Sequence, residues 1–483
     1  MSSPGTADQP LRVAVVGSGP AGFFVAQHLL AKSDLAVTVD LYERLLTPFG
    51  LVRFGVAPDH EEIKRVSRQF EKVAAKPAFR FFGTVDVGSH LTLDELRRYY
   101  HLICFTTGAQ TDRRMGIPGE ELARSHAATE FVAWYNGHPE YRDRHFDLSV
   151  ERVAVVGVGN VAVDVARILS RTADELSTTD IADHALRALQ RSRIKEVYIL
   201  GRRGPVQAAF TNAEVKELGE LAGADIRVPE DEIALDPLSH AEVERSDERS
   251  LHRKLEILRD FASRSPAGKG RTLTIRFLVS PVELVGNGAG EVVGLRVVRN
   301  RLVADGRGGL RAEATDRSEL LPVGLVFRSV GYHGVPLAGL PFDEKRGVVP
   351  NDRGRVLAPP SDVPLPGVYV GGWIKRGPSG VIGTNKPDAA QTVEAMLEDL
   401  ALGVVPSPPH PQPAAIEAFL RQRQPALVTY ADWRRIDQLE TARGQALGRP
   451  RVKFTSQEEM LAALNREEED RQTMMPVMAP SLA

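Results

Sequence analysis

Apolar residues form short, nearly uninterrupted runs along the first part of the chain, and amphipathic segments separate these runs. Residues 11–17 and 152–157 are rich in valine without polar alternation, which is typical of strands buried on both faces of a parallel sheet. Residues 37–44 predict a second strand, and residues 61–76 carry apolar side chains at every third or fourth position, which predicts an amphipathic helix. This alternation of strand and helix indicates an α/β fold with parallel sheets.

Later segments extend this pattern and then depart from it. Strands are expected in FRFFGTVDVG, and a helix followed by a buried strand in TLDELRRYYHLICFTTGA. Residues 229–268 are rich in charge and predict helices, whereas residues 271–311 contain the turns NGAG and DGRGG between β-rich runs and predict hairpins. Residues 404–413 form a proline-rich connector, after which the chain predicts peripheral helices.

The first apolar run leads into the motif G-x-G-x-x-G, formed by Gly17, Gly19 and Gly22. In a dinucleotide site the first glycine permits a tight turn, the second lets a pyrophosphate approach the backbone, and the third lets the helix pack on the strand. Glu43 ends the next strand, where a carboxylate accepts hydrogen bonds from ribose hydroxyls and repels a 2′-phosphate. This half of the chain therefore predicts a site for FAD or NAD and not for NADP; a packed turn without a ligand is the alternative.

A second turn of the same kind, G-x-G-x-x-A, follows at Gly157, Gly159 and Ala162. The next strand, within residues 196–204, ends in Arg202 and Arg203 and carries no carboxylate at that place. Paired guanidinium groups suit a ribose 2′-phosphate by charge and geometry, so this half favours NADP(H), with a solvated arginine loop as the alternative. Two such sites together predict a flavoprotein that exchanges hydride between NADPH and FAD.

The length, charge and cysteine content of the chain argue against several other classes of function. A length of 483 residues indicates two or three domains, and the 61 basic and 63 acidic residues nearly cancel, so no general attraction to nucleic acid is expected. The apolar runs are far shorter than the roughly 20 residues that span a bilayer, and the first ten residues lack the features of a secretion signal, so we expect a cytoplasmic location. Cys104 is the only cysteine, which excludes a redox-active cysteine pair within this chain.

Six stretches spread over residues 13–390 resemble the adrenodoxin-reductase type of ferredoxin-NADP reductase, especially its bacterial members. They are VAVVGSGPAGFFVAQHLL, YERLLTPFGLVRFGVAPDH, VAVVGVGNVAVDVARIL, LGRRGPVQAAFT, FRSVGYHGVPLAGLPFD and VGGWIKRGPSGVIGTNKPDA. The resemblance implies two Rossmann-like dinucleotide-binding domains, with one noncovalent FAD, NADPH as the hydride donor and a ferredoxin as the one-electron acceptor; no metal site is expected. The implied arrangement is an FAD domain at residues 1–115 and 346–403, an NADP domain inserted at 116–345, and a helical extension at 404–483 that packs on the FAD domain.

The resemblance also implies individual contacts with each cofactor. Those for the flavin are Ala21, Glu43, Leu51, Val87, Trp373, Gly380, Val381 and Ile382. Those for NADP(H) are Asn160, Val161, Arg202, Arg203, Glu214 and Gly380, with Arg113 or else Arg114 as a further contact. His60 and Glu214 are the polar candidates beside the hydride-transfer zone, although His60 has a purely local cap or pair as its alternative role. The glycines of the stretch GPSGVIGTNKPDAAQTVEAML come just before a predicted helix, whose first amides are suited to stabilise negative charge on the flavin; a plain loop is the alternative.

The expected electron acceptor requires a docking surface for an acidic iron–sulfur protein. Arg249 and Arg253 lie four residues apart in a predicted helix, with Lys254 beside them, and a basic face attracts such a partner. A solvated charged helix face is the alternative interpretation, and we expect a monomer. Two other functions stay open: delivery of hydride or electrons to quinones, dyes or oxygen, and service as an electron-entry subunit of a larger complex. Rapid NADPH oxidation without ferredoxin would favour the first of these.

Overall fold

The computed structural model describes residues 4–306 and 308–474, and the chain forms two compact units. Unit 1 comprises residues 1–56, 60–111 and 332–483, and unit 2 comprises residues 57–59 and 112–331. The two crossings near residues 112 and 332 differ from the expected boundaries at 116 and 346. The second lies earlier because the segment before Val349, which includes Leu337 and Phe342, packs in a core of unit 1.

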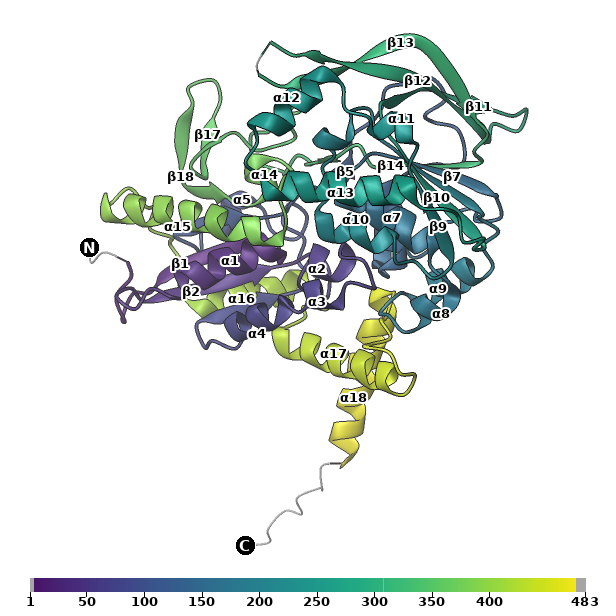
Figure 1. Ribbon diagram of the computed structural model, residues 1–483. Helices are drawn as coiled ribbons and strands as arrows, with labels where there is room; N and C mark the ends of the chain where they lie inside the picture. Colours follow the sequence, from purple (N-terminus) through teal and green to yellow (C-terminus); the bar gives the residue numbers. More distant parts are fainter. Residues whose placement is uncertain (1–3, 307, 475–483) are drawn as a thin grey trace, which may run out of the picture. The chain divides into compact units, whose positions relative to one another are not determined.

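Unit 1 contains a seven-stranded sheet in the order β16-β17-β18-β4-β1-β2-β3. Its parallel strands are β1 (Leu11–Val16), β2 (Val37–Tyr42), β3 (Phe79–Phe82), β4 (Leu102–Phe105) and β18 (Val363–Val370), and β16 (Asn351–Asp352) and β17 (Arg355–Ala358) pair antiparallel at one edge. Val13 and Val15 point into one core, whereas Ala14 and Val16 point into another on the opposite face. Figure 1 shows α1 (Pro20–Leu29) and α15 (Asn385–Ala401) side by side over the first of these cores.

Unit 2 contains a parallel six-stranded sheet in the order β6-β14-β7-β8-β10-β9. These strands are β6 (Ser125–Ala127), β14 (Leu325–Arg328), β7 (Arg152–Val156), β8 (Glu196–Leu200), β10 (Arg271–Arg276) and β9 (Ala224–Arg227). Val153 and Val155 face a core shared with α6 (Ala128–Tyr135) and α7 (Asn160–Ser170). The other face packs against an antiparallel three-stranded sheet of β11 (Val279–Gly286), β12 (Val292–Ala304) and β13 (Leu310–Leu321). The predicted α/β fold with parallel sheets is confirmed.

The remaining elements connect and cover the sheets. Those of unit 1 are α2 (Leu51–Phe54), α3 (Glu61–Lys64), α4 (Ser67–Ala74), α5 (Leu93–Leu96), β15 (Tyr332–His333), α14 (Trp373–Arg376), α16 (Pro413–Arg423), α17 (Tyr430–Gln445) and α18 (Gln457–Met474). Those of unit 2 are α8 (Ala173–Ser177), α9 (Asp183–Gln190), α10 (Asn212–Leu218), α11 (Glu230–Ile233), α12 (Pro237–Arg245) and α13 (Arg249–Ser263), and β5 (Thr111–Asp112) lies at the junction.

Two predictions of local structure are wrong in detail. The single helix expected over residues 61–76 is broken into α3 and α4. The Arg65 N–H is shared between the carbonyls of Glu61 and Glu62, and the Val66 N–H donates to Ile63, three residues back, as in a 3₁₀ turn. Residues 271–276 belong to a parallel strand, β10, between β8 and β9, and not to a hairpin. The hairpin interpretation holds for the rest of that region, where β11, β12 and β13 pair antiparallel.

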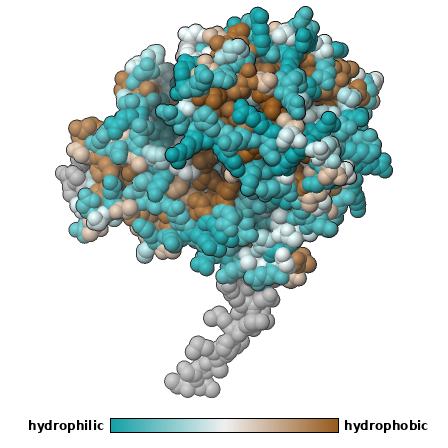
Figure 2. Space-filling model, viewed as in Figure 1, coloured by the Kyte–Doolittle hydropathy of each residue, from teal (hydrophilic) through white to brown (hydrophobic). Residues whose placement is uncertain are grey.

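Hydrophilic residues cover most of the face shown in Figure 2. Within the described ranges, each helix is either too short or too polar to cross a bilayer.

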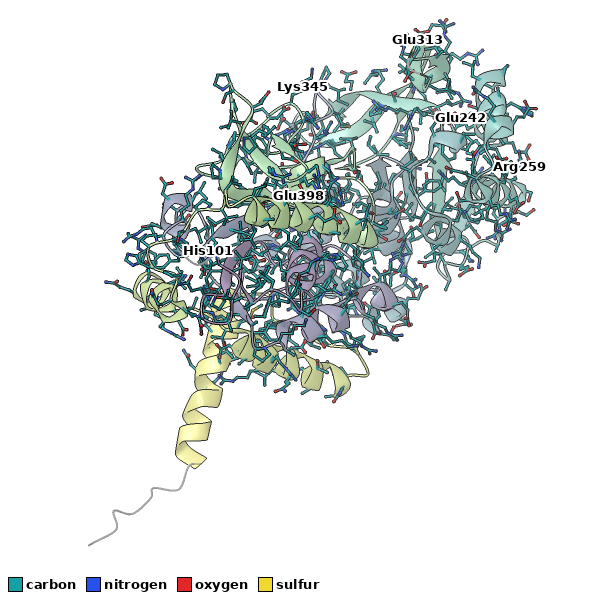
Figure 3. All side chains as sticks on the ribbon, turned by 90° about the vertical axis from the view of Figure 1, so that its left-hand side faces the viewer. His101, Glu242, Arg259, Glu313, Lys345 and Glu398 are labelled. Atoms are coloured by element: carbon teal, nitrogen blue, oxygen red, sulfur yellow. The ribbon has the colours of Figure 1, made fainter. Side chains whose placement is uncertain are left out.

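A buried hydrogen bond links the start of β1 to the segment before β4. His101, labelled in Figure 3, accepts a hydrogen bond at Nδ1 from the Arg12 backbone N–H over 3.0 Å. The backbone N–H of His101 donates to the Arg12 carbonyl, also over 3.0 Å. An imidazole that accepts at Nδ1 must be neutral. Burial, and next the positive charge of Arg12, lower the pKa of His101 to about 4.

We expect this histidine to make unit 1 less stable in acid. Because the folded pKa lies below the unfolded value near 6.5, the contribution is present above pH 6.5 and is lost as the pH falls toward 4. After allowance for solvent screening, the loss is about 1–3 kcal/mol. His101→Asn supplies an acceptor that does not titrate, so its urea midpoint should fall less than that of the wild type between pH 7 and pH 4.5. Equal losses in the two proteins would contradict this assignment.

Candidate functional site

The first glycine turn has the steric properties that a dinucleotide requires. Gly17 has φ +106°, and a Cβ at that residue would lie 2.7 Å from the Thr106 carbonyl oxygen. A Cβ on Gly22 would lie 2.1 Å from the Gly17 carbonyl oxygen, so only glycine lets α1 pack this closely on β1. Around Gly19, by contrast, no atom lies within 4 Å of the Cβ position. The turn is closed where packing needs glycine and open where a phosphate would approach.

Glu43 is fixed beside this turn. One of its carboxylate oxygens accepts hydrogen bonds from the Ser18 backbone N–H over 3.2 Å and the Ser18 hydroxyl over 2.6 Å, and the other accepts from the Leu45 N–H over 3.0 Å. The side chain is only half-buried, and a carboxylate offers about four acceptor positions, so capacity for ribose hydroxyls is left. The role of Ser18 in orienting Glu43 was missed by the sequence interpretation, although Ser18 lies between the first two glycines.

Two other segments of unit 1 converge on the same turn. A Cβ on Gly50 would lie 3.0 Å from the Gly19 Cα atom, and a Cβ on Gly372, which has φ +74°, would lie 2.6 Å from the Ala21 Cβ atom. The convergence lies at the carboxyl end of β1, where the chain switches from β2 on one side of β1 to β4 on the other. Such a switch point is where open parallel sheets bind their ligands.

The loop after β18 is held by a buried ion pair. Asp388 accepts a hydrogen bond from the Gly372 N–H over 2.6 Å and pairs with Lys375 at 3.1 Å. The Trp373 indole N–H donates to the Ser379 carbonyl over 3.1 Å, and the Tyr332 ring lies 5.2 Å from the Trp373 ring. The loop is therefore anchored from α15, and it leaves the Trp373 side chain partly exposed.

The other predicted flavin contacts lie on three short segments of unit 1. Val381 is 58% exposed and Leu51 is 37% exposed, whereas Val87 and Ile382 are half-buried. Gly380, with φ +78°, is followed by a 3₁₀ turn and then by α15, so the expected glycine-rich entry to a helix is present.

The second glycine turn repeats this geometry in unit 2. Gly157 has φ +135°, and a Cβ there would lie 2.2 Å from the Ser329 carbonyl oxygen, whereas the Cβ position of Gly159 has no neighbour within 4 Å. Ala162 is fully buried at the third position of the motif. The half-buried Asn160 accepts a hydrogen bond from the Thr211 N–H over 2.8 Å and so ties the turn to the start of α10; its neighbour Val161 is also half-buried.

Arg202 and Arg203 follow β8 at the same edge of this sheet. Arg202 is exposed and Arg203 half-buried, and within the part of the chain that the structure describes neither guanidinium has an ion-pair partner. Asn300 of β12 donates from its side-chain amide to the Arg202 carbonyl over 2.7 Å, so the backbone of the pair is fixed while the charges are left available. Asn300 was missed by the sequence interpretation, because nothing near residue 300 marks a contact with residue 202.

Arg113 and Arg114 differ from one another in whether the guanidinium group has an ion-pair partner. Arg114 forms an ion pair with Glu121, whereas Arg113 is exposed and has no ion-pair partner within the described ranges. The free guanidinium favours Arg113 as the nucleotide contact.

Glu214 belongs to a buried charge network that the sequence did not reveal. The fully buried Arg167 of α7 contacts Glu214 at 3.2 Å, Asp164 at 2.6 Å and Asp59 at 2.7 Å. These carboxylates keep Arg167 charged and raise its pKa well above the ordinary value despite burial. The segment 57–59 is thereby held in unit 2, and His60, which is buried, follows it directly in unit 1.

The predicted docking residues lie on α13 but do not form one uniform face. Arg249 and Arg253 are exposed, and Arg253 pairs with Glu256 at 2.8 Å. Lys254 turns inward instead, donating to the Ala208 carbonyl over 2.5 Å, and burial lowers its pKa. The expectation that Lys254 adds to the exposed charge is wrong, because Leu251, Leu255 and Leu258 anchor that side of the helix.

Known proteins match nearly the whole chain. The family model described as pyridine nucleotide-disulphide oxidoreductase matches residues 11–200. The chain is 47% identical over 461 residues to NADPH-ferredoxin reductase FprA of Mycobacterium tuberculosis, covering 94% of this chain and 99% of the relative. It is 43% identical over 471 residues to the mitochondrial NADPH:adrenodoxin oxidoreductase of Bos taurus, covering 95% and 93%. The solved structure of Mycobacterium tuberculosis FprA in complex with NADPH has a TM-score of 0.89 at 46% identity, covering 95% of this chain and 100% of that one.

Two parallel sheets, each with a glycine turn at its switch point, define a two-dinucleotide-binding-domain flavoprotein oxidoreductase. Within that class, the chain belongs to the adrenodoxin-reductase type of ferredoxin-NADP reductases, because relatives at this identity span nearly its full length.

Proposed function

We propose that this protein transfers hydride from NADPH to a noncovalently bound FAD in the cytoplasm and delivers electrons singly to a ferredoxin-type iron–sulfur protein. The observation that carries the proposal is the difference between the two glycine turns. A fixed carboxylate, Glu43, lies beside one turn, and two guanidinium groups without an ion-pair partner among the described residues, those of Arg202 and Arg203, follow the other. The first favours a free ribose and the second a ribose 2′-phosphate.

Unit 1 supplies the FAD site in this proposal. Gly17, Gly19 and Ala21 receive the pyrophosphate, Glu43 accepts from the adenosine ribose, and Leu51, Val87, Trp373 and the segment 380–382 line the flavin. When bound there, FAD would supply the capacity to take up two electrons with a hydride and to pass them on one at a time, with release of a proton, which is chemistry that the protein's own side chains lack. The disulfide route of other flavoproteins is absent, because Cys104 has no partner cysteine and burial raises the pKa of its thiol.

Unit 2 supplies the NADP(H) site. Gly157, Gly159, Asn160 and Val161 hold the pyrophosphate, and Arg202, Arg203 and Arg113 contact the phosphorylated ribose. Glu214, oriented by Arg167, lies near the nicotinamide side, and His60 borders the hydride-transfer zone. Both tune the geometry and the charge around the transferred hydride, since alignment of the donor and acceptor atoms contributes most to the rate.

The proposed electron acceptor is tested by a coupled assay. NADPH-driven reduction of cytochrome c should be slow with the purified protein alone and should rise in proportion to added ferredoxin. Quinones or oxygen consuming NADPH as fast as ferredoxin does would instead support a diaphorase or oxidase function. A requirement for a further protein subunit would support the electron-entry alternative.

The docking surface is a separate prediction. Reversing Arg249 and Arg253 to glutamate should raise the apparent KM for ferredoxin and flatten its dependence on salt, because the charges that attract an acidic partner are lost. NADPH–ferricyanide activity should stay near normal. Reversal of Arg311 and Arg317, two exposed arginines of β13 in the same unit, is the matched control and should leave the KM for ferredoxin almost unchanged. Equal damage to the ferredoxin and ferricyanide assays would contradict a docking role.

A further inference from the structure

The carboxyl-terminal helix α17 presents two buried side chains on one face to the segment that precedes and includes α2. Trp433 and Glu440 lie two helical turns apart, and Glu440 is 0% exposed. Their partners are Phe49 and Arg53, which flank Leu51, one of the proposed flavin contacts. A part of the chain expected to be peripheral thus reaches the border of the FAD site.

The segment at Phe49 has a backbone conformation that needs support. Phe49 has φ +84°, in the left-handed region that residues with a side chain rarely adopt. Its N–H donates to the Ser18 carbonyl over 3.0 Å, and the next residue, Gly50, is the one that approaches Gly19. This conformation therefore sets the position of the segment over the glycine turn, and it persists only when surrounding contacts fix it.

The rings of Phe23 and Phe70 supply some of these contacts, at 5.4 and 6.1 Å from the Phe49 ring, and α17 supplies the others. The Arg53 guanidinium donates two hydrogen bonds to the Glu440 carboxylate, over 2.6 and 2.9 Å, and lies 5.0 Å from the centre of the Trp433 ring. The Phe49 ring meets the same indole edge-on at 6.0 Å. Both charges of the Arg53–Glu440 pair are buried, so removal of either side chain would take this ion pair from a charge that stays buried, which is costly.

Glu440 is in turn fixed by the chain that follows α17. It accepts a hydrogen bond from the Phe454 N–H over 2.9 Å and contacts Arg451 at 3.3 Å. The carboxylate thus joins α17, the segment 451–454 and α2 through one buried group.

We propose that α17 is a functional part of the FAD site, in which Glu440 and Trp433 are positioning residues that hold Phe49 to Phe54 in the conformation that retains the flavin. The inference rests on the proposed FAD site at the first glycine turn. Neither residue contacts the cofactor; both act through Phe49 and Arg53. Retention of FAD is accordingly coupled to the docking of the carboxyl-terminal helix.

Release of FAD from the holoenzyme tests this coupling. Glu440→Gln keeps the shape of the side chain but removes its charge, and it should speed FAD dissociation, followed by the rise of free-flavin fluorescence, at least about tenfold. Hydrogen exchange in the same holoenzyme should increase in residues 49–54. Asp40→Asn is the matched control, because Asp40 is also a buried carboxylate of unit 1 held by two arginines, Arg12 and Arg80. The control should lose stability without faster exchange in residues 49–54.

A second variant keeps the test decisive if Glu440→Gln fails to fold. The double substitution Arg53→Met and Glu440→Leu removes both buried charges together, which proteins tolerate far better than removal of one. It should fold, yet release FAD faster than the wild type, because the two hydrogen bonds to α2 are lost. Normal FAD retention in this variant, or equally fast release from Asp40→Asn, would overturn the proposal. Failure of Glu43→Ala to weaken FAD binding would instead overturn the proposed FAD site itself.

Discussion

Replacing both Arg202 and Arg203 with glutamine should lower kcat/KM for NADPH by roughly 30- to 5,000-fold, or about 2–5 kcal/mol of transition-state binding. Both guanidinium groups are accessible and lack an ion-pair partner within the described residues, so their charge is available for a 2′-phosphate. NADH, which has no such phosphate, should be affected little. We expect the wild type to prefer NADPH by roughly tenfold to a thousandfold, about 1.4–4 kcal/mol.

Steady-state kinetics with both nucleotides measure this preference. Arg227→Gln is a suitable control, because Arg227 is an exposed arginine that ends β9 of the same sheet. It should change neither nucleotide's kcat/KM appreciably. A double variant that keeps its preference for NADPH would show that the 2′-phosphate is recognised by other residues.

The second large effect is expected at Glu43. Glu43→Ala should remove two charge-assisted hydrogen bonds to the ribose, each on the order of 1.5–3 kcal/mol, and so weaken FAD binding by about 3–6 kcal/mol. The purified variant should contain substoichiometric flavin. The substitution also frees Ser18, whose N–H and hydroxyl both donate to Glu43.

Glu43→Gln separates the two consequences of that change. Glutamine retains an acceptor for Ser18 but lacks the negative charge, so its loss of FAD affinity should be intermediate. Full flavin content and unchanged affinity in Glu43→Ala would show that another residue binds the ribose.

The strands and the glycine turns were predictable because their signals are local. An uninterrupted valine-rich run predicts a strand that is buried on both faces. Gly17 and Gly22 are required because a side chain at either position would collide with Thr106 or with the turn itself. The helix over residues 61–76 was predicted too long. The periodicity of apolar residues indicates which side of a helix is apolar, but it does not show whether the backbone hydrogen bonds continue. For the same reason, helical spacing alone did not show that Lys254 turns toward Ala208.

The supporting residues of the sites were not predictable from one sequence. Arg53 and Glu440 are separated by 387 residues, and Arg202 and Asn300 by 98. Such pairs form only when the fold brings them together, and neither member carries a motif. Arg167 looks in the sequence like an ordinary helix arginine, yet it is fully buried among carboxylates that include Glu214.

Transfer of electrons from NADPH through FAD to ferredoxin can be measured in one experiment, by following the absorbance of the flavin in the purified protein under anaerobic conditions. We expect that the protein carries FAD, that about one equivalent of NADPH bleaches it, and that NADH does so more slowly by roughly tenfold to a thousandfold. Added oxidised ferredoxin should then restore the absorbance of the flavin. A protein without flavin, a flavin that NADPH does not reduce, or a reduced flavin that ferredoxin leaves unchanged would show that the protein does not carry out this electron transfer.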